Sequence, residues 1–211
     1  MTLAGRYSFL WQPQGRIRCG CRRPGTVPAH RLDEYAGDYR HPGYGDLKVA
    51  LQGTQLSFTY NGITTPLGHW HFETFNGLKA EDPAFKDMKL TFRTDVNGNV
   101  VGLAVPFEAS LDDIYFAKKP DARLSDPAYL KTLLGSYTLA SQTVTVGLKG
   151  GTLTFSIPGQ PVYDLVPEVG GEFSLKVAKV VRLRFLEDAK GQVTGLEVSQ
   201  PSGVYEYKRT K

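Results

Sequence analysis

The segment Gly68-His69-Trp70-His71-Phe72 is the part of the chain whose residue types most suggest chemistry. Alternate side chains of a β-strand share a face, so His69 and His71 would lie together. Two neutral imidazoles can begin a metal site, but a third ligand such as His41 or Glu73 would have to converge on them. The pair can equally make structural hydrogen bonds at the surface or contact a ligand or partner. The structural interpretation is the simplest, and we expect no metal and no cofactor.

Aromatic residues are frequent in the same half of the chain, and they include Tyr35, Tyr39, Tyr44, Tyr60, Trp70, Phe72 and Phe75. Aromatic side chains around the mouth of a pocket suit an apolar or sugar-like ligand, and they equally make an ordinary core. The candidate ligand- or partner-binding residues are therefore Tyr44, Tyr60, His69, Trp70 and His71.

The sequence contains none of the common motifs for catalysis, cofactor binding or metal binding. It has no glycine-rich dinucleotide motif, phosphate-binding loop, C-x-x-C or H-E-x-x-H. Adjacent carboxylates occur at Glu81-Asp82, Asp112-Asp113 and Glu187-Asp188, all in predicted turns, where we expect solvated loop charges. The only cysteines, Cys19 and Cys21, have no second pair of ligands, so we expect free thiols. We predict no catalytic residue.

The net charge of +4 comes from the start of the chain. Residues 1–31 contain six arginines and no acid, leaving 19 basic residues against 21 acidic ones in the remainder. A basic arm can bind nucleic acid or an anionic membrane, but this one has no helical pattern. We expect a disordered leader over residues 1–30 and no nucleic-acid partner. No stretch approaches the ~18 apolar residues of a membrane span, and the lack of a signal-peptide core favours the cytoplasm.

The elements that must position these residues occur twice. Gly37 and Tyr39 match Gly135 and Tyr137 at an offset of 98, and the run 90–105 matches 183–198 at an offset of 93. The first copy spans 31–119, the linker 120–129 and the second copy 130–211. Within the linker, Ser125-Asp126-Pro127 can cap and start a short helix.

Each copy shows a hydrophobic period of two, which predicts strands with one buried face. Examples are the alternating apolar residues within 47–51 and 153–157, and turn signals such as Asn97-Gly98 and Lys190-Gly191 separate such runs. Each copy provides about eight short strands, which can remove their exposed edges by closing into a barrel. We therefore predict an all-β fold of two tandem antiparallel up-and-down β-barrels with a short helical linker. The alternative is a pair of packed open sheets in each copy.

The run Leu32-Asp33-Glu34-Tyr35-Ala36-Gly37-Asp38-Tyr39 through Gly45 resembles the opening of a lipocalin-like accessory domain, of the type called DUF3471. That domain follows the catalytic domain in β-lactamase-related, penicillin-binding-protein-like serine hydrolases. Residues 24–30 resemble the junction found there, and 134–196 resemble the same domain. The resemblance implies that the chemistry belongs to the preceding domain and that the barrel shapes substrate access or assembly.

The catalytic elements of those hydrolases are absent from this sequence. Their nucleophilic serine needs a lysine one helical turn later, in the pattern S-x-x-K, and neither this motif nor Y-x-N is present. We therefore expect a non-catalytic accessory module that packs on a serine-hydrolase catalytic domain or subunit. The alternatives are a carrier that binds a small apolar ligand inside one barrel and, as the weakest, an enzyme using the face of His69 and His71.

Overall fold

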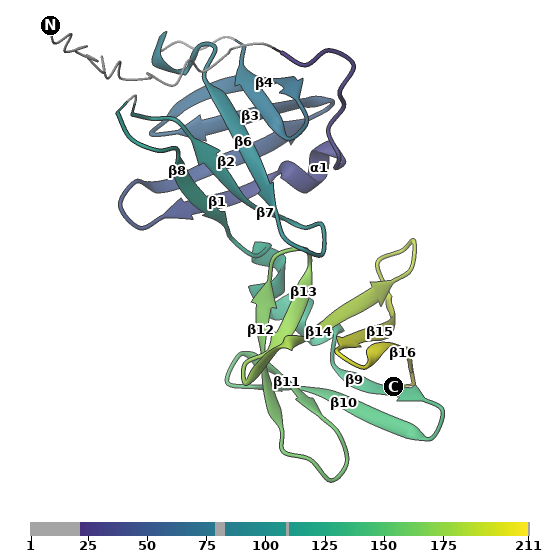
Figure 1. Cartoon of the computed structure of the whole chain (residues 1–211). Coiled ribbons are helices and arrows are strands. Elements are labelled where there is room, and N and C mark those ends of the chain that lie inside the picture. Colours follow the sequence, from purple (N-terminus) through teal and green to yellow (C-terminus); the bar gives the residue numbers. More distant parts are fainter. Residues whose placement is uncertain (1–21, 79–82, 109, 211) are drawn as a thin grey trace, which may run out of the picture.

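The alternating apolar runs form two closed antiparallel barrels joined by a short helical linker (Figure 1). The computed structural model describes residues 22–78, 83–108 and 110–210. The predicted all-β architecture is confirmed, and the alternative of open packed sheets is wrong. The expected disordered leader falls largely on residues 1–21, which lie outside the described residues, as do Cys19, Cys21 and Glu81-Asp82.

In the first barrel, consecutive strands are hydrogen-bonded neighbours, and the last strand pairs with the first. Helix α1 (Leu32–Tyr35) precedes the barrel, and the short 3-10 helix η1 (Pro83–Phe85) separates the fifth and sixth strands. The strands are β1 (Gly37–His41), β2 (Gly45–Gln52), β3 (Gln55–Tyr60), β4 (Ile63–His71), β5 (Thr74–Gly77), β6 (Lys89–Thr94), β7 (Val100–Val105) and β8 (Ile114–Lys118).

The second barrel has the same order of strands and closes between its last and first strands. Its strands are β9 (Gly135–Leu139), β10 (Gln142–Lys149), β11 (Thr152–Ser156), β12 (Tyr163–Glu168), β13 (Glu172–Leu175), β14 (Ala178–Glu187), β15 (Val193–Gln200) and β16 (Gly203–Arg209).

The linker contains the 3-10 helix η2 (Ala122–Ser125) and helix α2 (Pro127–Thr132), as the capping pattern predicted. The Asp126 side chain accepts a hydrogen bond from the Ala128 N–H at 2.9 Å, and Pro127 stands at the first turn, where its missing N–H costs nothing. The linker also binds the second barrel, because the Tyr129 hydroxyl donates to Glu187 Oε1 at 2.8 Å. The expectation that Glu187 is a solvated loop charge was therefore wrong.

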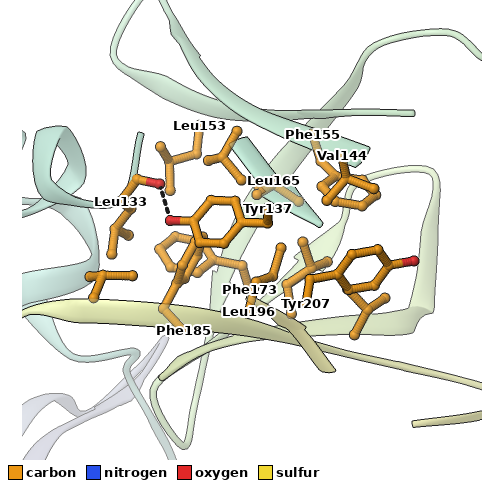
Figure 2. Packing of buried hydrophobic residues seen from close by; sticks show 14 of the residues in the cluster. Leu133, Tyr137, Val144, Leu153, Phe155, Leu165, Phe173, Phe185, Leu196 and Tyr207 are labelled. Carbon is orange, nitrogen blue, oxygen red and sulfur yellow. Dashed lines mark hydrogen bonds between the residues drawn. The ribbon is translucent and has the colours of Figure 1, made fainter. Parts of the chain in front are cut away.

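Large apolar side chains fill the interior of each barrel. The first barrel buries Tyr39, Phe58, Phe92 and Phe116 almost completely. The second packs residues such as Tyr137 into one continuous cluster, shown in Figure 2. Burial of this apolar surface is the main stabilising term of the fold, at about 25 cal/mol per Å².

One buried tyrosine makes the same contact in both barrels. The Tyr39 hydroxyl donates to the carbonyl oxygen of Tyr35 at 2.6 Å, and the Tyr137 hydroxyl donates to that of Leu133 at 2.7 Å. Each acceptor lies where the short helix before the barrel ends, so the tyrosine satisfies a helix-terminal carbonyl that has no partner within the helix. The repeated glycine–tyrosine pair in the sequence thus marks the point where each helix is fastened to its barrel.

Alternate turns of an up-and-down barrel lie at the same end. In the first barrel, the turns β2–β3, β4–β5 and β6–β7 share one end with α1, which we call the α1 end. The barrels approach each other here, since a Cβ atom added at Gly170 of the β12–β13 turn would lie 2.6 Å from Asn99 Oδ1. None of the described helices has the length and apolar character required to cross a membrane.

Candidate partner-binding site

The predicted binding residues lie at the two ends of the first barrel. Tyr44 and Tyr60 flank the β1–β2 and β3–β4 turns at the end away from α1. His69, Trp70 and His71 are the last residues of β4, at the α1 end. The structure therefore brings these residues together as two separate groups, and all five side chains are half-buried.

The tyrosine group fills the mouth of the barrel with its own side chains. Phe107 stacks on Tyr60 with ring centroids 4.6 Å apart and on Tyr44 at 6.1 Å. The Tyr60 hydroxyl donates to the Tyr44 carbonyl oxygen at 3.0 Å, and the Tyr44 hydroxyl donates to Glu108 Oε1 at 2.6 Å. This bond to Glu108 raises the pKa of Tyr44. The rings and hydroxyls at this end thus already have partners within the barrel.

The two histidines do not converge on a common point with a third ligand. A register shift separates them in the β4–β5 ladder. His69 Nε2 lies 2.9 Å from the Phe72 carbonyl oxygen, while His71 Nδ1 faces the Arg23 N–H at 3.5 Å. His41 lies at the other end of the barrel. Among the residues that the structure describes, no group of three His, Cys, Asp or Glu side chains could hold a metal ion.

The β4–β5 turn holds a bulky residue in a conformation that such residues rarely adopt. Phe72 has a φ of 46°, in the left-handed region, and its side chain is 56% exposed. For an L-residue this region costs about 1–2 kcal/mol, and a bulky residue there is an outlier. Its N–H faces Thr26 Oγ1 at 3.4 Å. The chain thus holds Phe72 in a strained backbone conformation although more than half of its ring remains exposed.

Basic groups surround this turn. Lys89 Nζ lies 4.0 Å from the centroid of the Trp70 ring, a cation–π contact, and Arg22 Nε donates to the Trp70 carbonyl oxygen at 3.0 Å. The ring of His71 lies between those of Trp70 and Phe72, with centroids 6.5 and 5.7 Å away. We call the set Arg22, Arg23, Trp70, His71, Phe72 and Lys89 the hairpin patch. It is an aromatic surface with positive charge at its edge.

A carboxylate next to the hairpin patch fastens residues 22–31, which we call the lead-in, to the barrel. Glu73 accepts from the Tyr35 hydroxyl at 2.6 Å and from the Ala29 N–H at 2.9 Å, and its Oε2 lies 3.4 Å from His30 Nδ1. Burial, with this hydrogen bond to Glu73, raises the pKa of Tyr35. On its other side, His30 Nε2 lies 2.6 Å from the Gly98 carbonyl oxygen. The network ties the lead-in to two turns of the α1 end.

Sequence reasoning considered Glu73 only as a metal ligand and did not single out His30. Their contact joins the lead-in to a turn more than forty residues away, and no local motif signals it.

Residues 21–118 match the model of a family described as a domain of unknown function, DUF3471. The first barrel is a DUF3471 domain. The match confirms that the opening run of that barrel resembles DUF3471. It also includes the lead-in from Arg22, so the segment that supports the hairpin patch is part of the matched DUF3471 region. No curated protein matches the chain.

Proposed function

We propose that this chain is a non-catalytic accessory module that binds a partner protein through the hairpin patch of its DUF3471 barrel. The observation that carries the proposal is Phe72, which combines a left-handed backbone with an exposed ring. Strained backbone persists where the surrounding structure enforces it, and it clusters at functional sites. Here the Glu73 network and the lead-in provide that enforcement.

The filled interior of the first barrel favours a surface function over the carriage of an apolar ligand inside it. Tyr39, Phe58 and Phe116 are each fully buried within the cluster, and Phe107 stacks across the mouth. An eight-stranded barrel is just wide enough for side chains to fill it or for one small ligand. In this barrel the side chains occupy that space.

The charge of the hairpin patch indicates an acidic partner. The basic side chains of Arg22 and Lys89 contact Trp70, and the backbone of Arg23 contacts His71. The nearby carboxylate of Glu73 is already engaged by Tyr35 and Ala29. Complementary charge mainly raises the rate of association, and aromatic anchors supply most of the affinity. The resemblance to domains that follow a catalytic domain suggests the partner: a serine-hydrolase catalytic domain or subunit with an acidic face.

The proposal can be tested with the purified full chain and the serine-hydrolase catalytic domain encoded nearest to its gene. We expect Phe72→Asn and the charge reversal Lys89→Glu each to weaken binding at least about tenfold in calorimetry. Binding of the natural sequence should also weaken as salt screens the basic edge. The matched control is Val204→Asn, which changes a 63% exposed apolar residue on the second barrel. Equal binding by Phe72→Asn, Val204→Asn and the natural chain would refute the proposal.

A further inference from the structure

The wall of the second barrel is incompletely paired between β11 and β12. These strands pair only at Thr154–Asp164 and Phe155–Tyr163, whereas β3 and β4 of the first barrel pair at five positions from Leu56–Leu67 to Tyr60–Ile63. Beyond Thr154 the two strands of the second barrel diverge toward the linker. The gap between them, which we call the seam, begins at Leu153. In the first barrel the equivalent residue, Leu56, still pairs with Leu67.

A cavity of about 340 Å³ occupies this seam. Its inner side is made of core residues, Leu153, Leu165 and Phe173, each no more than 2% exposed. Leu124 and Leu130 of the linker, 1% and 4% exposed, line another side. The volume is at the lower end of the range for small-molecule sites, and an apolar lining is typical of them. The cavity therefore suits a small ligand with an apolar body.

Hydrogen-bond donors gather among the remaining lining residues. Lys176, Thr152 and Ser125 line the cavity and are all exposed, so they lie where solvent reaches it. Asp164 also lines the cavity and forms an exposed ion pair with Lys176, with Oδ2 and Nζ 3.7 Å apart. The ammonium has three hydrogen atoms, so it can still donate to a ligand beside this pair. One ammonium and two hydroxyls together favour an acceptor-rich, anionic group at the rim.

We propose that the seam of the second barrel binds a short aliphatic carboxylate, with its chain against the leucines and its head group at Lys176. At roughly 30 Å³ per non-hydrogen atom, the cavity holds about ten such atoms, the size of octanoate. A ligand of that size binds weakly, with a Kd expected near 1 mM. The site is independent of the hairpin patch, which lies on the other barrel.

The test is a titration of the full chain with octanoate, followed by amide chemical shifts. We expect saturable shifts at Gly151, Thr152 and Val166. Lys176→Gln should weaken octanoate about threefold to tenfold, as expected for a charged hydrogen bond near the surface. The matched control is Lys179→Gln, an exposed lysine on the neighbouring β14, which should leave octanoate binding unchanged. Octanol carries no charge, so its affinity should change little between the natural chain and Lys176→Gln.

A second variant separates loss of the site from loss of the fold. Val166→Phe adds volume to a half-buried lining position and should abolish the shifts while the far-ultraviolet spectrum stays unchanged. The proposal is overturned if octanoate shifts residues of the first barrel instead, if Lys176→Gln and Lys179→Gln bind it equally, or if octyltrimethylammonium binds at least as well.

Discussion

Substitutions at Phe72 can separate backbone strain from side-chain contact. Its left-handed φ costs an ordinary L-residue about 1–2 kcal/mol, but asparagine tolerates that region. The ring is 56% exposed, so its partial burial contributes about 1 kcal/mol of the 1.5–3 kcal/mol that a fully buried phenylalanine supplies. Phe72→Ala loses this contact and keeps the strain, and should destabilise the barrel by about 1 kcal/mol. Phe72→Asn loses the contact but relieves the strain, and should be close to neutral.

Urea unfolding measures this difference directly. The chain has two tryptophans, Trp11 and Trp70, so in a Trp11→Phe background the tryptophan fluorescence comes from the first barrel alone. A difference of about 1 kcal/mol between Phe72→Asn and Phe72→Ala corresponds to roughly 0.7–1 M urea at the midpoint for a domain of this size. Equal midpoints with equal slopes would mean that position 72 carries no strain, and the inference from strain to function would fail with it.

Three further predictions concern the tyrosines and the Glu73 network. Tyr39→Phe and Tyr137→Phe should each cost about 1–2 kcal/mol in urea unfolding, because a buried helix-end carbonyl loses its donor; a cost below about 0.5 kcal/mol would contradict this role. Burial raises the pKa of Tyr137 to about 12, against about 10 when unfolded, so the folded state holds this proton more tightly. The contribution of this proton to the free energy of unfolding is therefore complete below about pH 10 and is lost as the pH rises to about 12. Tyr137→Phe should remove that part of the alkaline loss of stability. If stability falls with pH between 10 and 12 as steeply in Tyr137→Phe as in the natural chain, this prediction is wrong. Glu73→Gln should weaken the hold on the lead-in and speed hydrogen exchange at the Ala29 amide, whereas unchanged protection there would show that the carboxylate does not fasten it.

The fold was predictable because its causes are local. Alternation such as Leu47, Val49 and Leu51 specifies a strand with one buried face. The repeated Gly and Tyr positions revealed two similar units, and Asp126-Pro127 marked the start of α2. Each of these signals lies within a few residues of the element that it specifies.

The site was less predictable because it depends on contacts between distant segments. Period-two reasoning placed His69 and His71 on one face, but the register shift between them breaks that pattern. The sequence does not indicate the left-handed backbone of Phe72, because such a turn position is usually occupied by glycine or asparagine. The contact between His30 and Glu73 could be predicted only by knowing that the lead-in crosses the α1 end. No residue of the lead-in indicates that path.

The corresponding hairpin in the second barrel supports the assignment of the patch. The β12–β13 turn carries Val169-Gly170-Gly171 where the first barrel carries its aromatic turn, and Gly170 has a φ of 89°. A Cβ atom at Gly170 would lie 2.6 Å from Asn99 Oδ1 of the first barrel, so the Asn99 side chain would have to move. The positive φ of Gly170 also favours glycine at this position. One position of the fold thus serves two contacts. In the second barrel the position is a glycine close to the neighbouring barrel, and in the first it carries a bulky ring that contacts His71 and is still 56% exposed. An exposed ring kept at such a conformational cost is what the proposed partner contact would account for.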